Sequence, residues 1–516
     1  MFAIICVLLV FVVYYFVLQP FLISPLRKIP GPKSYAITKW RLAFEDYRGR
    51  RTRSIDSLHR KYGPVVRIGP NEVHFNSSTS LRKIYGAGSG FERTSFYRMF
   101  DVYGKQNLFT FESSKAHGAR KKLLAHAYSK SEMLTSISPM IESRVQEYME
   151  FLQNHIDKPN DIFTTLHYFS LDSITHFLYG AKFGGTFAVT GNAAHRALLL
   201  DILDPSRRKL SWFAVHLPKL TKWLYTRTAT MEKMIAPLLP MSKPATYTAI
   251  RAHALQAFEM SKQAVAKNGL DDIKGQALIA DLWPHHQRNK SGGLDDLELA
   301  SECADHLLAG IDTTADSLMF LIWVLSLPEN EMVQQKLSRE VRNVSPDSPS
   351  HDFPSVRSAA QLPYLDAVIK ETLRLYSPLP ASEPRCMPNQ ATVIDGYSIP
   401  AGTIVCASAY SINRNDNVYE DPLEFDPDRW LDEKGQMTAK SSFAFSAGGR
   451  MCIGMHLATA EMTTLVTAIY RNYTTHIAPG FEGKSPAITS RFELFFDESM
   501  PHIEEHTCMI NFKKIV

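Results

Sequence analysis

A single cysteine near the carboxyl-terminal end of the sequence stands where it could become an anionic metal ligand. Cys452 lies in the stretch Phe445–Gly454, just ahead of a run whose apolar residues recur with helical spacing from Ile453 to Ile469. Free backbone N–H groups and the positive end of a helix dipole favour a thiolate over a thiol there. Because a free cysteine titrates near ~8.5, a sulfur that serves as an anionic ligand needs this help.

The neighbours of this cysteine strengthen the interpretation. Gly448 and Gly449 permit backbone conformations that let the chain approach a flat partner closely. Arg450 carries a planar fork of donors suited to a carboxylate, and Phe445 can cover one side of the sulfur. For an arbitrary lone cysteine, a buried structural role is the better interpretation. Here all five fixed positions of Phe-x-x-Gly-x-Arg-x-Cys-x-Gly are present, which favours a ligand.

A second motif lies inside the long apolar pattern that begins at Leu297. The stretch Ala309–Thr314 contains a glycine and two threonines, which weaken a helix interior. Threonine hydroxyls can bond a carbonyl one turn back and bend the helix. We therefore expect a locally widened helix on which Asp312 and Thr313 could deliver protons to a bound oxygen ligand. Taken alone, the motif would be simpler to interpret as a surface aspartate beside capping threonines.

A third set of residues is structural in type. Glu371 and Arg374 are three residues apart, so they lie on one helix face and can pair. Arg429, in the stretch Phe425–Trp430, could complete a buried three-member network with them. Loss of one member would leave a buried charge unpaired.

These motifs stand in an order that resembles the cytochrome P450 family. The resemblance implies a mainly α fold with small β-sheets, in which the Cys452 thiolate is the axial ligand of the iron of haem b. Such a ligand pushes electron density onto the iron and favours O–O cleavage. It also implies that Asp312 and Thr313 form an acid–alcohol pair. Glu371, Arg374 and Arg429 would be a structural triad that holds the core around the haem loop.

The same resemblance assigns residues to the haem edge. Arg450 and Arg385 would bind propionates, and Phe445 would line the haem. The family commonly has Trp-x-x-x-Arg in the helix where this chain has His117 and Lys121, and both can still donate to a carboxylate. Asn413 stands where many relatives have a histidine, which leaves that propionate contact open.

The substrate pocket is expected to be apolar. Aromatic residues crowd the segment 91–111, although core packing is the simpler interpretation for any single ring. With His306, Ala309 and residues 379–382, they would wall a pocket in which His306 and Ser382 are possible polar anchors. A lipophilic small molecule is the expected substrate: a terpenoid, polyketide or alkaloid intermediate, as in the fungal microsomal members of secondary metabolism that the chain resembles.

The resemblance implies an O2-dependent monooxygenase. Its rivals are a haem-thiolate isomerase or dehydratase that uses no O2, and a haem-binding sensor; neither needs the Asp312–Thr313 pair. The sequence shows no flavin or nicotinamide domain, so NADPH-derived electrons would come through a separate NADPH–cytochrome P450 reductase, with cytochrome b5 as a further donor. Arg120 and Lys122 could form a basic patch that steers an acidic partner.

The amino-terminal residues predict a membrane anchor. Residues 2–18 carry no charge, a length at the short end for a spanning helix, and the first basic residues follow the apolar stretch. A cleaved signal peptide would want a basic start and a small-residue cleavage site, and neither is visible. We expect an anchor at 1–24, a proline-rich hinge at 25–34 and a catalytic domain at 35–516, cytosolic and tied by one span to the endoplasmic reticulum membrane.

Composition excludes other classes. The chain has 516 residues and a net charge of only +5, which does not suggest nucleic-acid binding. Its 6 cysteines have no paired spacing, which argues against a disulfide scaffold or a Cys-x-x-Cys zinc site and suits a reducing compartment. Short β-prone runs at 65–68 and 72–75, separated by a turn signal at 69–71, predict a strand pair.

Overall fold

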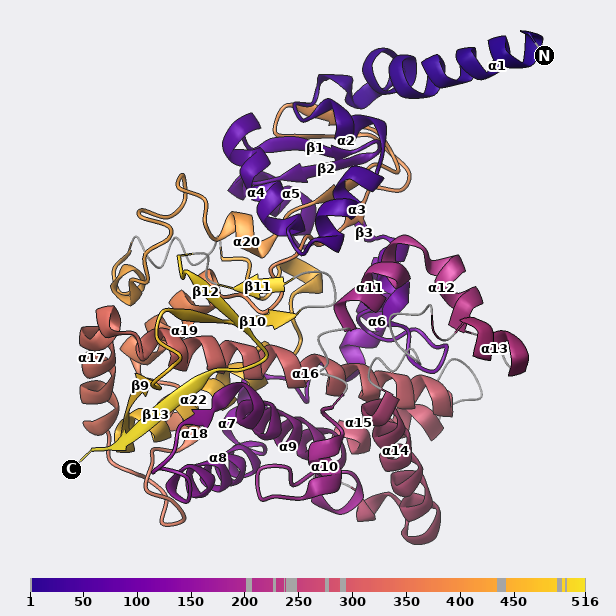
Figure 1. Ribbon diagram of the computed structural model, residues 1–516. Helices are drawn as coiled ribbons and strands as arrows, with labels where there is room; N and C mark the ends of the chain where they lie inside the picture. Colours follow the sequence, from indigo (N-terminus) through magenta and orange to yellow (C-terminus); the bar gives the residue numbers. More distant parts are fainter. Residues whose placement is uncertain are drawn as a thin grey trace.

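The long helix α16 (Asp296–Leu325) runs through the middle of the computed structural model (Figure 1). Asp295 and Glu298 form a reciprocal capping box at its start. From Leu299 onward most of its side chains are buried. The structure describes residues 2–200, 207–225, 229–235, 237, 248–273, 278–287, 294–433, 442–489, 494–496 and 499–515.

Helix α9 (Ile162–Phe183) packs closely along α16. A Cβ on Gly310 would stand 2.7 Å from Ile174 Cγ1, so this glycine is what allows the two helices to approach. Other long or site-bearing helices are α6 (Ser114–Leu124), α8 (Ser138–Gln153), α14 (Thr248–Asn268), α15 (Leu278–Gln287), α17 (Glu331–Arg342), α19 (Pro363–Leu375) and α22 (Met455–Asn472).

Shorter helices complete the helical part. They are α2 (Lys33–Ile37), α3 (Trp40–Tyr47), α4 (Arg51–Tyr62), α5 (Ser78–Tyr85), α7 (Lys130–Leu134), α10 (Ala193–Ala197), α11 (Arg207–His216), α12 (Pro218–Tyr225), α13 (Ala229–Ile235), α18 (Val356–Ala359) and α20 (Ala409–Ile412), with the 3-10 turns η3 (Ser95–Phe100), η6 (Pro328–Asn330), η7 (Pro427–Trp430) and η9 (Gly448–Arg450).

The strands form small sheets beside this helical mass. The largest has the order β1-β2-β8-β5-β3, from strands β1 (Val65–Gly69), β2 (Glu72–Phe75), β8 (Ile404–Cys406), β5 (Arg385–Cys386) and β3 (Glu92–Arg93). The predicted strand pair is confirmed, since β1 and β2 are antiparallel with Val65 opposite Phe75. The remaining described strands form smaller sheets. One has the order β4 (Asn160–Asp161), β13 (Met509–Lys514), β9 (Tyr473–Ile477), and another has the order β11 (Leu494–Phe496), β10 (Lys484–Thr489), β12 (His502–Glu505). Strand β6 (Thr392–Ile394) pairs with β7 (Tyr397–Ile399). A mainly α fold with small β-sheets is therefore confirmed.

The amino-terminal helix projects from the body of the molecule (Figure 1). It consists of α1 (Phe2–Val13) and a π-helical continuation, η1 (Tyr14–Ile23). The stretch Ile4–Ile23 has a mean hydropathy of 2.5 and is long and apolar enough to cross a membrane, while almost none of it is buried. Helix α16 passes the same test of length and composition, but it is mostly buried and belongs to the core.

The proline-rich segment that follows is not a free linker. Arg67 on β1 is buried, and its guanidinium donates to Pro20 O at 2.9 Å and Ser24 Oγ at 3.2 Å. Its backbone N–H donates to Pro30 O at 2.8 Å. The chain that leaves the apolar helix is thus held against the first strand. The division at residues 24 and 34 stays a prediction.

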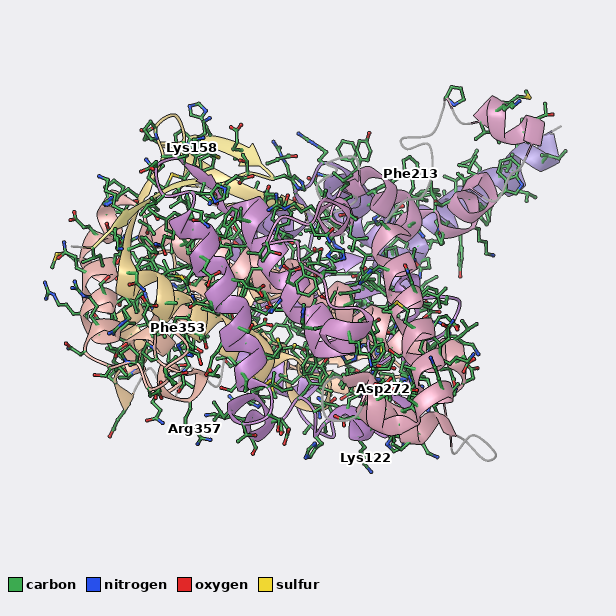
Figure 2. All side chains as sticks on the ribbon, turned by 90° about the horizontal axis from the view of Figure 1, so that it is seen from below. Lys122, Lys158, Phe213, Asp272, Phe353 and Arg357 are labelled. Atoms are coloured by element: carbon green, nitrogen blue, oxygen red, sulfur yellow. The ribbon has the colours of Figure 1, made fainter. Side chains whose placement is uncertain are left out.

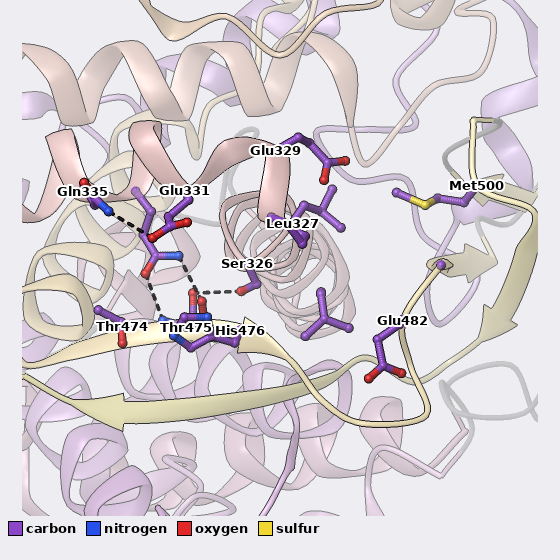
Figure 3. A pocket seen from close by; sticks show the side chains of 14 residues that line it. Ser326, Leu327, Glu329, Glu331, Gln335, Thr474, Thr475, His476, Glu482 and Met500 are labelled. Carbon is purple, nitrogen blue, oxygen red and sulfur yellow. Dashed lines mark hydrogen bonds between the residues drawn. The ribbon is translucent and has the colours of Figure 1, made fainter.

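A groove of about 510 Å³ opens at the carboxyl-terminal end of α16, between η6 and β9 (Figure 3). Its wall carries the carboxylates Glu329, Glu331 and Glu482 together with apolar side chains such as Leu327 and Ile477. None of the residues that the motifs single out lines this groove, so the chemistry of the motifs lies elsewhere.

Candidate active site

The cysteine loop has the local structure that its spacing predicts. Cys452 follows η9 and stands just before α22, whose first residue is Met455. Its backbone N–H donates to Phe445 O at 3.0 Å, which closes the loop on itself. The thiol keeps accessible surface, although protein atoms surround it closely.

Electrostatics at the sulfur differ from the expectation. Burial raises the pKa of the Cys452 thiol, and the N–H groups of Gly454 and Met455 together with the ammonium of Lys121 oppose that rise. The helix terminus therefore acts in the expected direction, but desolvation outweighs it in the protein alone. A bound metal cation deprotonates a coordinating thiol outright, so iron would supply what the helix does not.

The loop glycines have different roles. Gly448 has a φ of 62°, and a Cβ there would stand 2.2 Å from Tyr85 O. Its conformation is needed for contact with the end of α5 rather than for approach to a flat partner. Gly449 has open space around its Cα and fits the expected approach. Ser446, also at positive φ, is tied down by a 2.8 Å bond from its hydroxyl to Glu383.

The structure gathers the predicted propionate ligands into one cationic cluster. Arg450 donates to Phe111 O at 2.6 Å and Glu112 O at 2.7 Å. Arg385 is buried and donates to the Tyr97 hydroxyl at 2.6 Å and to Glu383 at 2.9 Å.

Lys121 and His117 belong to the same cluster. Lys121 donates to Gly449 O at 3.1 Å and Met451 O at 3.0 Å, so it also clamps the cysteine loop to α6. Burial and the charges of Arg450, Arg93, Lys121 and Arg385 lower the pKa of His117 to about 3. His117 is therefore neutral at pH 7 in the protein alone, and only a nearby anion would favour its charged form.

Arg93 is a member of this cluster that sequence reasoning missed. It is buried on β3 directly opposite Arg385 on β5, and its guanidinium lies 4.5 and 4.6 Å from the ring centroids of Tyr97 and Phe109. Like charges opposite each other across a sheet destabilise it. Burial, then Arg93 and Arg385, lower the pKa of Arg450 to about 9.

Buried donors in the cluster still lack acceptors. The Nε atoms of Arg93 and Arg450 are buried and have no hydrogen-bond partner among the described residues. Orphaned guanidinium donors beside mutually repelling cations fit a dicarboxylate such as the haem edge. The donor set therefore suits the group that the sequence implies.

Asn413 does not join the cluster. Its side-chain oxygen accepts from Phe443 N–H at 3.1 Å, and its carbonyl accepts from Arg374 at 2.9 Å. It supports the start of the cysteine loop.

The acid–alcohol pair lies where α16 meets α9. Thr313 Oγ1 donates to Ala309 O at 2.7 Å, as a threonine one turn along a helix can. Asp312 Oδ1 stands 4.0 Å from His167 Nε2 on α9, and Asp316 Oδ1 stands 3.8 Å from the same nitrogen. The expected widening is wrong, because α16 is one continuous α-helix from Asp296 to Leu325.

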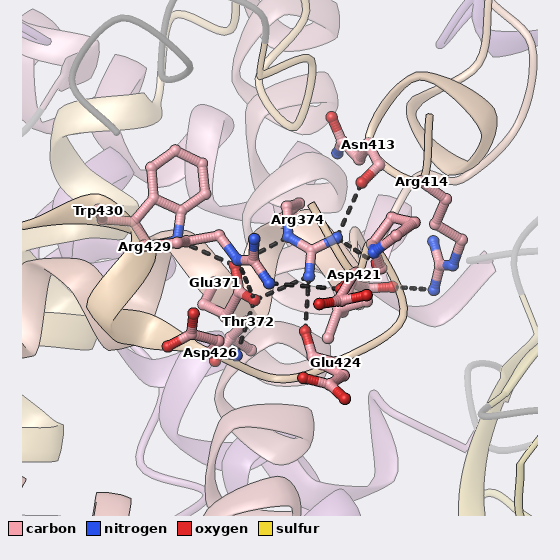
Figure 4. Close-up of polar contacts among 12 residues, drawn as sticks. Glu371, Thr372, Arg374, Asn413, Arg414, Asp421, Glu424, Asp426, Arg429 and Trp430 are labelled. Carbon is pink, nitrogen blue, oxygen red and sulfur yellow. Dashed lines mark hydrogen bonds and ion pairs between the residues drawn. The ribbon is translucent and has the colours of Figure 1, made fainter. Parts of the chain in front are cut away.

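The predicted triad forms a buried network (Figure 4). Glu371 is fully buried and accepts from Arg374 at 2.7 and 2.8 Å and from Arg429 at 3.0 Å. It also accepts from Trp430 Nε1 and from Asp426 N–H, both at 2.9 Å. One carboxylate thus joins α19 to the segment that precedes the cysteine loop.

Two residues lie elsewhere than expected. Arg120 is buried and pairs with Glu302, so it cannot belong to a docking surface; Lys122 is exposed at the edge of the molecule (Figure 2). His306 is buried and bonds Tyr128 and Glu302, so it is not free to anchor a substrate. Two further residues were expected to wall the substrate pocket. The ring of Tyr97 contacts the guanidinium groups of Arg93 and Arg385, whereas Ala309 on α16 is exposed.

Comparison with known proteins gives the family. The model of the family Cytochrome P450 matches residues 30–496. Cytochrome P450 monooxygenase aflV of Aspergillus parasiticus is 31% identical over 460 residues, which cover 88% of this chain and 85% of that protein. Cytochrome P450 monooxygenase stcB of Emericella nidulans is 29% identical over 452 residues, 87% of this chain and 82% of that protein.

A third relative agrees with these two. Cytochrome P450 monooxygenase FUS8 of Gibberella moniliformis is 27% identical, with 89% of this chain and 85% of that protein covered. The match spans nearly the whole chain, including the cysteine loop, the cationic cluster and the acid–alcohol pair. The chain belongs to the cytochrome P450 family, and it is a haem-thiolate monooxygenase that receives its electrons from a redox partner.

Proposed function

We propose that this chain binds one haem b through Cys452 and inserts one oxygen atom from O2 into a lipophilic intermediate of fungal secondary metabolism, usually as a hydroxylation. The observation that carries the proposal is the cysteine loop clamped by Lys121 beside a cationic cluster with orphaned donors. Haem bound there would supply reductive O2 activation. Arg385, Arg450, Arg93, His117 and Lys121 would hold its carboxylates.

The chain's own residues would manage water and protons. Asp312 and Thr313 stand side by side on α16, and Asp312 Oδ1 lies 4.0 Å from His167 Nε2 on α9. The exposed Ala309 leaves room next to them. A charged substrate would lose its hydration in an apolar pocket, which favours a terpenoid, polyketide or alkaloid intermediate.

The electrons would come from NADPH through a microsomal NADPH–cytochrome P450 reductase, with cytochrome b5 as a second donor. The apolar helix Ile4–Ile23 would hold the enzyme in the endoplasmic reticulum membrane with its catalytic domain in the cytosol. The exposed Lys122 fits an acidic partner, and such steering weakens with salt.

The test is an assay with reductase, NADPH and 18O2 on lipophilic extracts of a strain that lacks the gene. A product heavier by one 18O atom, formed only with NADPH and O2, is the expected result. Turnover without either would identify an isomerase or dehydratase. An enzyme with haem but no product from any extract would favour a sensor.

Thr313→Ala and Asp312→Asn should uncouple electron use from product formation. General acid help is typically worth ~10²–10⁴-fold, so product formation should fall by about that range while NADPH is still consumed. The measurement is product and hydrogen peroxide per NADPH. Ser317→Ala is the matched control, because its hydroxyl bonds Thr313 O one turn along. Equal loss in the control would assign the effect to helix structure.

Arg93→Leu should weaken haem binding while the chain stays folded. Hydrogen bonds to charged groups contribute about 1.5–3 kcal/mol, so haem should leave at least tenfold faster. Transfer of haem to an excess of apomyoglobin measures the rate. Arg98→Leu is the control, since Arg98 is exposed and pairs with Asp101 on the surface. Unchanged haem loss in Arg93→Leu would remove Arg93 from the site.

A further inference from the structure

A buried chain of hydrogen bonds runs from α6 through α16 to Tyr128. Glu302 on α16 is fully buried, pairs with Arg120 of α6 and accepts from Leu108 N–H at 3.0 Å. His306 Nε2 lies 3.2 Å from Glu302, and His306 Nδ1 lies 2.5 Å from the Tyr128 hydroxyl. The side chains of Glu302, His306 and Tyr128 are all buried.

These hydrogen bonds determine which of the donor and acceptor atoms carry a proton. Glu302 is held as a carboxylate by a guanidinium and a backbone N–H, so it takes the Nε2–H of His306. The other ring nitrogen, Nδ1, is then a free acceptor for the Tyr128 hydroxyl. The order hydroxyl, imidazole and carboxylate orients a base toward one O–H group, as in enzymes that activate a hydroxyl.

Tyr128 lies close to the predicted iron ligand. A Cβ on Gly454 would stand 3.9 Å from Cys452 Sγ and 4.0 Å from Tyr128 Cε1, so the sulfur and the ring both lie beside Gly454. Neither the predicted oxygen chemistry nor the cationic cluster uses this tyrosine. Burial raises its pKa well above the usual value, so it keeps its proton at any physiological pH.

We propose that Tyr128 is a redox-active tyrosine that gives one electron to the oxidised haem site while its proton moves to His306 Nδ1. The inference rests on the haem binding of the proposed function. The oxidant is a hydroperoxide, whose O–O bond breaks; with two electrons and two protons from the solvent it becomes the alcohol and water. Of the two electrons that this takes, one comes from the haem and one from Tyr128. The products on the chain are a neutral tyrosyl radical and an imidazolium beside the Glu302 carboxylate.

The proton acceptor is what makes this tyrosine different. A buried ring that lost an electron and kept its proton would carry an uncompensated charge, which is costly in a protein interior. Transfer of the proton over 2.5 Å places the charge next to a carboxylate instead. Tyr148 and Tyr470 are also buried, but each hydroxyl meets a threonine hydroxyl at 3.0 Å, which cannot take a proton.

Such a tyrosine would reduce the oxidised haem site when no substrate does so. It would thereby protect the haem and Cys452 from oxidation. The test mixes haem-loaded enzyme with cumene hydroperoxide in the absence of substrate, freezes it within milliseconds and records the electron paramagnetic resonance spectrum. A tyrosyl signal is expected in the unmodified enzyme. It should be lost in Tyr128→Phe, lost in His306→Gln, and retained in Tyr148→Phe.

Protein grown with ring-deuterated tyrosine should show the same signal with collapsed hyperfine splitting, which identifies the radical without any substitution. A haem-loaded enzyme that gives no tyrosyl radical, or a Tyr128→Phe variant that keeps the full signal, overturns the proposal. Both outcomes leave the monooxygenase proposal standing, because haem content and product formation are measured on the same samples. Absence of haem in the unmodified protein would instead defeat the proposed function.

Discussion

Glu371→Gln should destabilise the protein more than any other single substitution outside the cysteine loop. The carboxylate accepts bonds from two guanidinium groups, an indole and a backbone N–H, and three of these donors are buried or nearly so. Removal of one partner of a buried ion pair costs about 3–5 kcal/mol, because the remaining charge has no compensation. We expect little soluble protein and little bound haem, measured by urea unfolding and by haem absorbance per chain.

Lys370→Gln is the matched control. It is the neighbouring residue on the same helix, but it pairs with Asp366 on the surface, where an ion pair is worth about 0–1 kcal/mol. Its unfolding midpoint should stay near that of the unmodified protein. Similar midpoints for both variants would mean that Glu371 does not hold the core together.

Local signals predicted the parts of the site that lie within one stretch of chain. The cysteine loop is recognisable because the spacing of Phe445, Gly448, Arg450 and Cys452 forms a motif, and the helix after it has a clear period. Glu371 and Arg374 share a helix face for the same reason. Only the resemblance to a family connected Arg429, 58 residues after Glu371, with that pair.

Contacts made by the sheet and by helix packing join residues that are distant in sequence, so local patterns could not predict them. Arg93 joins the cationic cluster because the sheet places it opposite Arg385, although the two are far apart in sequence. Arg120 was predicted to form a basic patch with Lys122, yet it pairs with Glu302 on another helix. The available signal was that Glu302 stands among apolar residues on the core face of α16, since a buried acid requires a partner.

Packing also explains why α16 is a regular helix without the expected widening. Gly310 and the threonines weaken a helix by propensity, but α9 presses against this segment and the helix stays regular. Tertiary contact therefore overrides the local preference. Tertiary contact also fixes the proline-rich segment, because Arg67 on β1 donates hydrogen bonds to Pro20 O and Pro30 O.

Cys452→Ala should abolish turnover. It removes the sulfur that would bind the iron, and loss of a residue behind a metal ligand already costs about 10–100-fold, so loss of the ligand itself should cost more. The fold should survive, because Cys452 has accessible surface and its backbone bond to Phe445 remains. Cys508→Ala is the control: that thiol is buried beside β13 and far from the loop in sequence.

The central claim is that the Cys452 sulfur is the iron ligand, and one spectrum tests it most directly. The purified protein is reduced with dithionite under carbon monoxide, and its difference spectrum is recorded beside those of Cys452→Ala and Cys508→Ala. The strongly red-shifted Soret band of a thiolate-bound haem should be present in the unmodified protein and in Cys508→Ala, and absent from Cys452→Ala. The same band in all three proteins, or no haem in the unmodified protein, would contradict the assignment.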